Sequence, residues 1–374
     1  QKYIYIGTTK QTGLMTLEGL CEDGHKLSKE ILAAAKSQVC ASDSDMILFT
    51  SGTSGSPKGV ITTHYSRVNN VRAQALVLDA TYTDKFLIVL PMFHCFSLSA
   101  SILAAMAVGA CVCFPENRRT KTILKTIEEN KCTILTAVPT LFSAILARND
   151  IKDYDLSTLR TGLIGGSTYP PSLFRKICNE LGFELLPSLG QTEATAGITA
   201  GRFSDSMEVK SQTVGRFLEH IEGSIKDMDG NLLSQGQQGE ICIRGYNVMQ
   251  GYYKRPDLTK MVIDNDGWLH TGDIGYIDDQ LNIHLTGRIK DMIIRGGENI
   301  APSEIEDVIA DLPGIRQVKV VGVPDDHYIE EICACIVCTD DSKVTPDEIR
   351  QYLKGFLAYY KIPKHIVFID SLPM

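Results

Sequence analysis

The stretch ILFTSGTSGSPKGVITTH, residues 47–64, decides how the rest of the chain is interpreted. An apolar run that predicts a buried strand leads into a loop of Gly, Ser, Thr, Pro and Lys. The glycines let backbone amides approach an anion closely, the hydroxyl groups add donors, and Lys58 adds positive charge. Because Pro57 precedes Lys58, the loop is not a Walker A motif and does not run straight into a helix. The buried strand before it favours a phosphate-binding loop over a flexible linker.

Length and composition predict a globular protein of several domains. The chain has 374 residues, 44% hydrophobic and 22% charged, so we expect two or three domains with a large core. A net charge of −8 argues against a general nucleic-acid binder. The run 86–115 carries no charge, but Pro91, His94 and several serines interrupt it, and we predict no transmembrane segment.

The chain contains eleven cysteines. Most lie in apolar runs such as ACVCF (110–114) and ICACIVC (332–338). Alternation along a strand would place Cys333 and Cys335 on one face and Cys338 on the other. We therefore interpret them as core thiols rather than metal ligands, which favours a reduced, cytoplasmic location.

The order of the apolar patterns predicts an α/β fold. Strand-like runs and helical patterns alternate, at 46–50, 86–90, 111–114, 134–137 and 163–164 for strands and 65–78, 120–130 and 171–181 for helices. This alternation predicts a large N-terminal domain of parallel-rich sheets with flanking helices. After about residue 209, turn signals separate short strands, which predicts an antiparallel β subdomain with a hairpin tip near Asp279 and Gln280.

A small α+β domain is expected at the C-terminal end. The order helix, strand, strand, helix follows residue 291, with one capping box from Ser303 to Glu306 and another from Thr345 to Glu348. Pro346 suits the first position of the second helix. We divide the chain into a large domain, residues 1–289, and a small domain, residues 290–374.

Seven motifs in order give the chain a specific resemblance. They are TSGTSGSPKG (50–59), LPMFH (90–94), LIGGS (163–167), SLGQTEAT (188–195), GWLHTGDIGYID (267–278), LTGRIKDMIIRGGENIAPSEIE (285–306) and YYKIPKHIVFIDSLP (359–373). Together they resemble the adenylate-forming (ANL) superfamily, with a medium- or long-chain acyl-CoA synthetase as the nearest type. The resemblance implies the acyl-CoA synthetase fold and a two-step reaction. A carboxylate attacks the α-phosphate of ATP to give acyl-AMP and pyrophosphate, and the thiol of coenzyme A then displaces AMP.

The resemblance also implies roles for individual residues. Thr192 would contact the α-phosphate, Glu193 would hold Mg²⁺, Asp273 would accept both ribose hydroxyls, and Lys290 would mark the hinge between the domains. The implied catalytic residues are His94, Thr192, Glu193 and Lys290. The implied nucleotide- and CoA-binding residues are Thr50, Ser51, Gly52, Thr53, Ser54, Gly55, Lys58, Gly165, Gly166, Ser167, Leu189, Gly190, Gln191, Thr192, Asp273, Arg288, Gly296 and Gly297.

One position departs from the family pattern. Leu189 stands where the family has a tyrosine stacked on adenine, so we expect the stacking contribution of about 0.5–1.5 kcal/mol to be reduced.

The residues after the second motif bear on the acid substrate. Phe93 is followed by His94 rather than the Asp that binds an amino-acid ammonium, so an α-amino acid is not expected. The apolar segments 93–101 and 137–146 are expected to line the pocket of an aliphatic or aromatic acid.

Alternatives stay open at this point. The chain could be another adenylating enzyme, luciferase-like or loading a carrier protein, or a catalytically impaired nucleotide-binding fragment. Compared with the family, the chain is short at both ends and stops before a Thr-x-x-Gly-Lys segment whose lysine bridges carboxylate and α-phosphate. We expect the printed chain alone to form acyl-AMP slowly. Peripheral membrane association and homo-oligomerisation also stay open.

Overall fold

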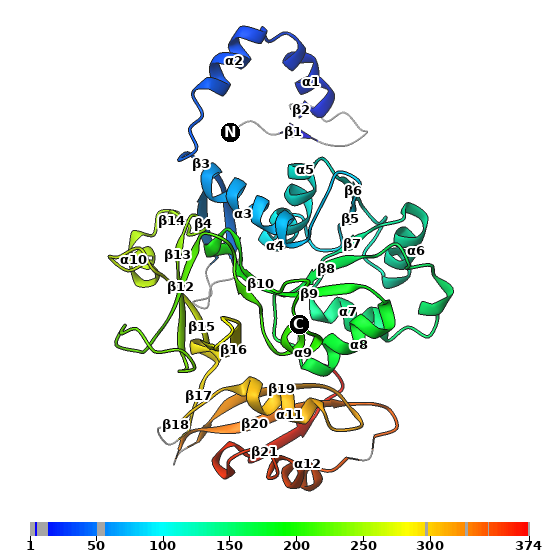
Figure 1. The fold of residues 1–374 in the computed structure, drawn as a ribbon, viewed down its shortest axis with the longest axis vertical. Helices are drawn as coiled ribbons and strands as arrows, with labels where there is room; N and C mark the ends of the chain where they lie inside the picture. The colour runs from blue at the N-terminus through cyan, green and yellow to red at the C-terminus, as the bar shows by residue number, and fades with distance from the viewer. Residues whose placement is uncertain are drawn as a thin grey trace.

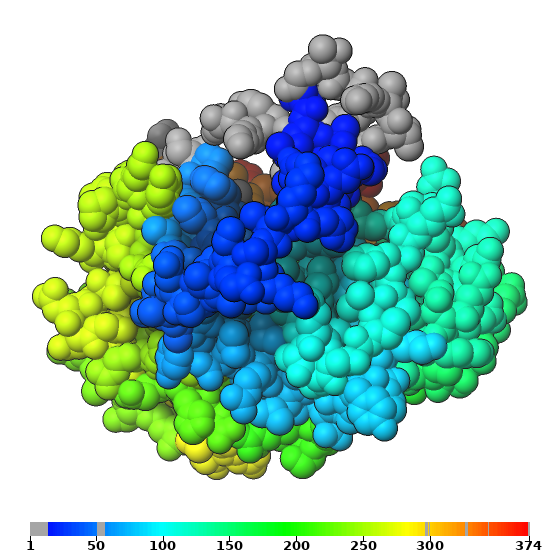
Figure 2. Space-filling model, turned by 90° about the horizontal axis from the view of Figure 1, so that it is seen from above, coloured from blue at the N-terminus to red at the C-terminus, as the bar shows by residue number. Residues whose placement is uncertain are grey.

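A computed structural model describes residues 4–5, 14–50, 57–295, 298–325, 328–342 and 344–372. Figure 1 shows a large body above a smaller domain formed by the C-terminal residues. The parallel pair β1 (Ile4–Tyr5) and β2 (Met15–Thr16) and the helices α1 (Leu17–His25) and α2 (Lys29–Ser37) precede the body. Neither helix has a buried residue, and seen from above both lie across the outer surface (Figure 2).

A seven-stranded sheet forms the centre of the body, in the order β11-β10-β9-β8-β7-β5-β6. Pairing is parallel from β6 to β9 and antiparallel at β10 and β11. The strands are β5 (Lys85–Leu87), β6 (Cys111–Cys113), β7 (Ile134–Leu135), β8 (Thr161–Ile164), β9 (Glu184–Gln191), β10 (Ala196–Ala200) and β11 (Arg216–Phe217). This confirms the predicted parallel-rich sheet.

Helices and helical turns connect the strands of the body, and several of them build the core around this sheet. They are α3 (His64–Val77), α4 (Cys95–Ser97), the π-helical turn η1 (Leu98–Leu103), α5 (Ala104–Val108), α6 (Thr120–Asn130), α7 (Pro139–Leu146), η2 (Ile151–Asp153), α8 (Pro171–Leu181), η3 (Thr192–Ala194), α9 (Met207–Gln212) and α10 (Pro256–Val262). Both α6 and α8 have the predicted bounds. Their buried faces, including Ile123 and Phe174, join the largest core cluster.

Two antiparallel sheets complete the body. The first has the order β14-β4-β3 and consists of β3 (Ser44–Thr50), β4 (Lys58–Thr63) and β14 (Gly251–Tyr252). The strand predicted at 46–50 therefore belongs to an antiparallel hairpin rather than to the parallel sheet. The second sheet confirms the predicted antiparallel subdomain, with β12 (Ile221–Lys226), β13 (Gly239–Gly245), β15 (Leu269–Ile277) and β16 (Ile283–Arg288).

The small domain is a five-stranded sheet with two helices. After the short turn η4 (Ile289–Asp291) come β17 (Ile293–Arg295), β18 (Glu298–Ile300), α11 (Pro302–Ala310), β19 (Ile315–Asp325), β20 (Ile329–Cys338), α12 (Pro346–Leu353), η5 (Tyr359–Lys361) and β21 (His365–Phe368). A separate core cluster, with Ile305, Ile336 and Ile349, supports a second domain. The division at Lys290 stays a prediction.

The two predicted capping boxes have different outcomes. At α12, Thr345 accepts from the backbone N–H of Glu348, whose side chain accepts from the Thr345 backbone, as predicted. At α11 the prediction was wrong, because Ala301 is the N-cap residue. The Ser303 hydroxyl instead donates to the Thr286 carbonyl, and Glu306 accepts from the backbone N–H of Val320.

The eleven cysteines are all free. Cys113 and Cys333 are buried as expected and Cys335 is half-buried, but Cys111 is exposed because β6 forms the edge of its sheet. The charge-free run 86–115 forms short strands and helices. Across the described residues, no helix is long and apolar enough to cross a membrane.

A buried arginine ties the β3–β4 hairpin to the central sheet. Arg67 on α3 is 5% exposed, and its Nε donates to Asp45 Oδ2 on β3 at 2.9 Å. Its Nη1 donates to Ser99 Oγ at 2.9 Å and to the Thr195 carbonyl at 3.1 Å. Its Nη2 donates to Thr62 Oγ1 on β4 at 2.7 Å. One guanidinium therefore fixes four segments relative to one another.

The Arg67→Ala variant should lower the free energy of unfolding by about 3–5 kcal/mol, because Asp45 stays buried without its partner. Urea unfolding followed by circular dichroism measures the change. The control is Arg72→Ala, which removes an exposed arginine from the same helix and should alter stability by less than about 0.5 kcal/mol. Equal losses in the two variants would contradict a special role for the buried ion pair.

Candidate active site

A cavity of about 740 Å³ opens at the carboxyl end of β9. The ends of β9 and β16, the start of β4, η3 and a turn within β15 form much of its wall. In a sheet with parallel strands, this edge is the usual place for a ligand. The predicted site residues on the wall are Thr50, Lys58, His94, Gly166, Leu189, Gly190, Gln191, Thr192, Glu193, Arg288 and Lys290.

Other predicted residues lie beside this wall or outside the described chain. Ser167 lines a neighbouring cavity of about 290 Å³ that Gly166 also borders. Gly165 packs against β9, since a Cβ there would lie 2.6 Å from the carbonyl oxygen of Ser188. The candidates that fall outside the described residues are Ser51, Gly52, Thr53, Ser54, Gly55, Gly296 and Gly297.

Glu193, the predicted metal ligand, is oriented by Tyr252 on β14. The Tyr252 hydroxyl donates to Glu193 Oε1 at 2.8 Å, and burial together with this carboxylate raises the pKa of Tyr252. The Lys58 ammonium lies 5.1 Å from the centre of the Tyr252 ring, within cation–π distance. One tyrosine therefore holds a carboxylate and a cation on the same wall.

Thr192 begins a turn with unusual backbone angles. Thr195 has φ +62° and Ala196 φ +150°, a region that residues other than glycine rarely occupy. The Thr195 hydroxyl donates to the Asn247 carbonyl at 2.7 Å, which holds the turn in this conformation. The Thr192 hydroxyl donates to Cys95 Sγ at 3.5 Å, and burial raises the pKa of that thiol. The turn thus presents Thr192 beside a neutral thiol.

Asp273 on β15 and Arg288 on β16 form a cross-strand pair behind the cavity wall. Asp273 is 1% exposed, and Arg288 Nε donates to its Oδ1 at 2.8 Å. The other carboxylate oxygen, Oδ2, is buried and has no hydrogen-bond partner among the described residues. Burial raises the pKa of Asp273 despite the opposing effect of Arg288.

His94 faces the cavity from the residue before α4. Its Nδ1 accepts from the backbone N–H of Phe96 at 3.2 Å, so the neutral ring carries its proton on Nε2. The side chain is exposed to the cavity, yet desolvation by the surrounding protein lowers its pKa. The ring can therefore donate a hydrogen bond into the cavity without carrying charge.

The predicted acyl pocket is represented only in part on this cavity wall, and its location stays a prediction. His94, Cys95 and Phe96 line the cavity, but none of the residues 137–146 does. Phe142 and Ile145 of α7 pack instead into the large core cluster. An apolar pattern suits a core helix and a pocket wall equally, so the sequence alone does not separate them.

The sequence motifs did not identify several residues that line the cavity. Gln74 on α3, Glu240 on β13, Tyr252 on β14 and His270 on β15 all line the cavity. Glu240 lies in a stretch that we interpreted only as strands and turns, and His270 lies in the motif 267–278, to which we assigned a role for Asp273 alone. Tyr252 carried no signal, because its contact with Glu193 joins residues 59 positions apart.

Comparison with known proteins extends over both domains. The family model of AMP-binding enzymes matches residues 8–253, and the model of the AMP-binding enzyme C-terminal domain matches residues 304–374. The chain is 41% identical over 377 residues to the putative acyl-CoA synthetase YngI of Bacillus subtilis (strain 168), covering 99% of this chain and 68% of that protein. It is 41% identical over 336 residues to the mitochondrial medium-chain acyl-CoA ligase ACSF2 of Bos taurus, covering 88% of this chain and 54% of the relative.

A solved structure supports the same grouping. The o-succinylbenzoate CoA synthetase MenE from Bacillus subtilis, in complex with the acyl-adenylate intermediate OSB-AMP, matches with a TM-score of 0.79 and 32% identity. The match covers 90% of this chain and 67% of that chain, so these proteins are all longer than the chain described here. Family matches, identity and fold agree, and the chain belongs to the AMP-binding enzyme family, within the adenylate-forming superfamily that its motifs resemble.

Proposed function

We propose that the protein is an ATP-dependent acyl-CoA synthetase acting through an acyl-adenylate. The observation that carries the proposal is one cavity whose wall combines Lys58, Glu193 and His94 with the Arg288 that pairs Asp273. Each group would meet one part of the substrates. Lys58 would bind the phosphates and Glu193 a phosphate-bound cation. His94 would contact the carboxylate, and Asp273 the ribose. The named relatives include acyl-CoA ligases, and the MenE structure holds an acyl-adenylate.

The nucleotide half of the site follows from charge and hydrogen bonding. Thr50 and Lys58, which stand on either side of residues 51–57, would bind the outer phosphates, and Thr192 would bind the α-phosphate. Asp273 Oδ2, buried without a partner among the described residues, would accept a ribose hydroxyl. Leu189 is buried in a core cluster and lines the cavity, so its apolar surface would cover one face of the base.

The wall also fits a magnesium ion. Mg²⁺ commonly binds through one or two carboxylates together with substrate phosphates. Glu193 supplies such a carboxylate, with Tyr252 fixing its orientation through Oε1. When bound, Mg²⁺ would neutralise charge on the phosphate oxygens.

The acid half of the site centres on His94. Its Nε2–H would orient the carboxylate, whose oxygen attacks the α-phosphorus while pyrophosphate leaves. The thiol sulfur of CoA would then attack the acyl carbonyl carbon, and AMP would leave. The segment 93–101 carries no acidic or basic side chain apart from His94, which suits an aliphatic or aryl acid. The preference for a medium- or long-chain fatty acid comes from the family resemblance.

The acceptor of the acyl group, the hinge between the two domains and the cellular location of the protein stay predictions. Passage of the CoA arm past Gly296 and Gly297 and a hinge at Lys290 come from the family resemblance. A carrier protein is the alternative acceptor. The free cysteines favour a reduced compartment, and we keep the cytoplasmic prediction, although the relative ACSF2 is named as mitochondrial.

The full-length protein should release pyrophosphate from ATP and Mg²⁺ only when an acid is added. A panel of fatty acids from short to long, aryl acids and dicarboxylates identifies the acid. Adding CoA or a holo-carrier protein to the best acid then identifies the acceptor. Absence of acid-dependent pyrophosphate release across the panel would contradict the proposed activity, and ATP binding without it would support the nucleotide-binding alternative.

The Asp273→Asn variant should weaken ATP binding by about 1.5–3 kcal/mol, because the ribose loses a charged acceptor. It should not lower stability at pH 7. Burial raises the folded-state pKa of Asp273, so ionisation opposes folding above the unfolded-state pKa, and this penalty grows as pH rises through the raised value.

Isothermal titration with ATP and urea unfolding measure the two effects of the Asp273→Asn variant. Asp266→Asn, an exposed acidic residue ahead of β15, is the matched control and should change neither. An unchanged ATP dissociation constant for Asp273→Asn would refute the ribose contact.

A further inference from the structure

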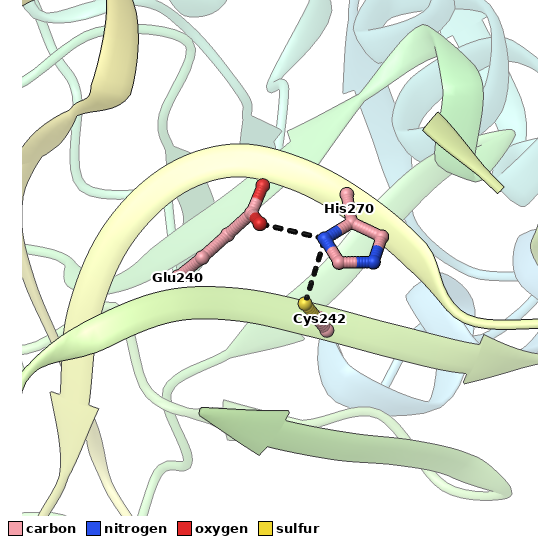
Figure 3. Close-up of side chains that lie close together, drawn as sticks. All are labelled: Glu240, Cys242 and His270. Atoms are coloured by element: carbon pink, nitrogen blue, oxygen red, sulfur yellow. Dashed lines mark hydrogen bonds and ion pairs between the residues drawn. The ribbon is translucent and has the colours of Figure 1, made fainter. Parts of the chain in front are cut away.

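A three-residue cluster adjoins the turn that carries Asp273 (Figure 3). Glu240 and Cys242 on β13 face His270 on β15. Glu240 Oε2 lies 2.6 Å from His270 Nδ1, and Cys242 Sγ lies 3.5 Å from the same nitrogen. Because an ionised carboxylate only accepts, the His270 Nδ1–H donates to Glu240. Glu240 and His270 both reach the cavity wall, whereas Cys242 is fully buried.

The cluster stands where β15 bulges away from β13. Cys242 pairs with His270, and Glu240 pairs with Ile274, so that Ile241 alone faces the three residues 271–273. Gly272 has φ +73°, a conformation that glycine adopts without strain. A bulge leaves backbone groups without their ladder partners, and side chains must satisfy them.

The side chains of Glu240 and Thr271 form hydrogen bonds with the backbone groups that the bulge leaves unpaired. Glu240 Oε1 accepts from the backbone N–H of Gly272 at 2.9 Å. The Thr271 hydroxyl donates to the Ile241 carbonyl at 2.7 Å and accepts from the backbone N–H of Asp273 at 3.1 Å. The Glu240 carboxylate therefore joins His270 on one side of the turn to Gly272 on the other, immediately before Asp273.

The same three side chains could be considered as a metal site, but their geometry disfavours it. Ligand atoms about 2.0 Å from a tetrahedral zinc ion lie roughly 3.3 Å apart. The 2.6 Å between Glu240 Oε2 and His270 Nδ1 is a hydrogen bond and leaves no room for both to bind one ion. Burial raises the pKa of the Cys242 thiol to about 12, so without a bound metal ion the residue is a neutral thiol.

We infer that Glu240 and His270 are positioning residues for ribose recognition. They hold the bulge so that the Asp273 carboxylate is presented to the ribose hydroxyls of the nucleotide. This inference rests on the proposed function, since it takes Asp273 as the ribose acceptor. Asp264 Oδ2, which accepts a hydrogen bond from Lys226 at 2.9 Å, lies 3.7 Å from His270 Nε2 on the far side of the imidazole.

The test compares ATP with 2′,3′-dideoxy-ATP, which lacks both ribose hydroxyls, by isothermal titration on the full-length protein. Glu240→Ala and His270→Ala should each weaken ATP binding by about tenfold, the lower end of the loss that follows removal of the outer partner of a metal-ligating residue, which holds its neighbour in the same way. Binding of the dideoxy nucleotide should change by less than about twofold, because it makes no contact with Asp273.

Two further variants separate positioning from packing. His270→Asn keeps a side-chain N–H near the position of Nδ1 and should retain ATP affinity within about threefold of the native protein. Cys242→Ala removes the third member of the cluster and should leave the affinity for both nucleotides unchanged. Equal weakening of ATP and dideoxy-ATP by Glu240→Ala would show a general structural role and overturn the inference.

The Asp273→Asn variant distinguishes the failure of the inference from that of the proposed function. If Asp273→Asn weakens ATP binding and Glu240→Ala does not, the positioning role alone is overturned. If Asp273→Asn has no effect on ATP, the ribose contact fails and the inference fails with it. Tight binding of Zn²⁺ that Cys242→Ala abolishes would also overturn it, in favour of a metal site.

Discussion

The site depends on the hydrogen bonds of one buried guanidinium. Arg67 joins Asp45 and Thr62 of the β3–β4 hairpin to the backbone carbonyl of Thr195, just after Glu193. The hairpin carries Thr50 and Lys58, so the same guanidinium ties this part of the wall to the turn that carries Glu193. Each of the three Arg67 nitrogens donates to at least one acceptor, and Asp45 supplies the opposite charge, which are the conditions under which a buried charge is tolerated. The strained backbone at Thr195 is held by the same contacts.

The site also shows how function conflicts with stability. Asp273 keeps one carboxylate oxygen buried and without a partner among the described residues, and its pKa is raised by that burial. A protein selected only for stability would place a neutral side chain there. The half-exposed Arg288 compensates for part of this penalty, and the bulge next to Glu240 fixes the direction of the carboxylate. The unpaired oxygen and the raised pKa of Asp273 are both explained if a bound nucleotide donates a hydrogen bond to that oxygen.

Local patterns in the sequence predicted local structure well. The helices at 120–130 and 171–181 were found with their bounds because their apolar spacing is regular and their faces are buried. The capping box at Thr345 was found because it involves only neighbouring residues. The motifs placed most candidate residues on one wall. The antiparallel partner of β3, the core position of Phe142, and the contacts of Glu240 with His270 and Tyr252 with Glu193 were not found. Each of these depends on strand pairing or packing between distant segments, which no local pattern encodes.

The central claim is that a carboxylate oxygen attacks the α-phosphorus of ATP in the cavity beside Thr192. The most direct measurement uses an acid labelled with oxygen-18 in its carboxylate, together with ATP, Mg²⁺ and CoA, and analyses the products by mass spectrometry. The account predicts one labelled oxygen in AMP and none in pyrophosphate, because AMP leaves with the oxygen that formed the acyl-adenylate bond. Unlabelled AMP, or label in inorganic phosphate released with ADP, would contradict an acyl-adenylate.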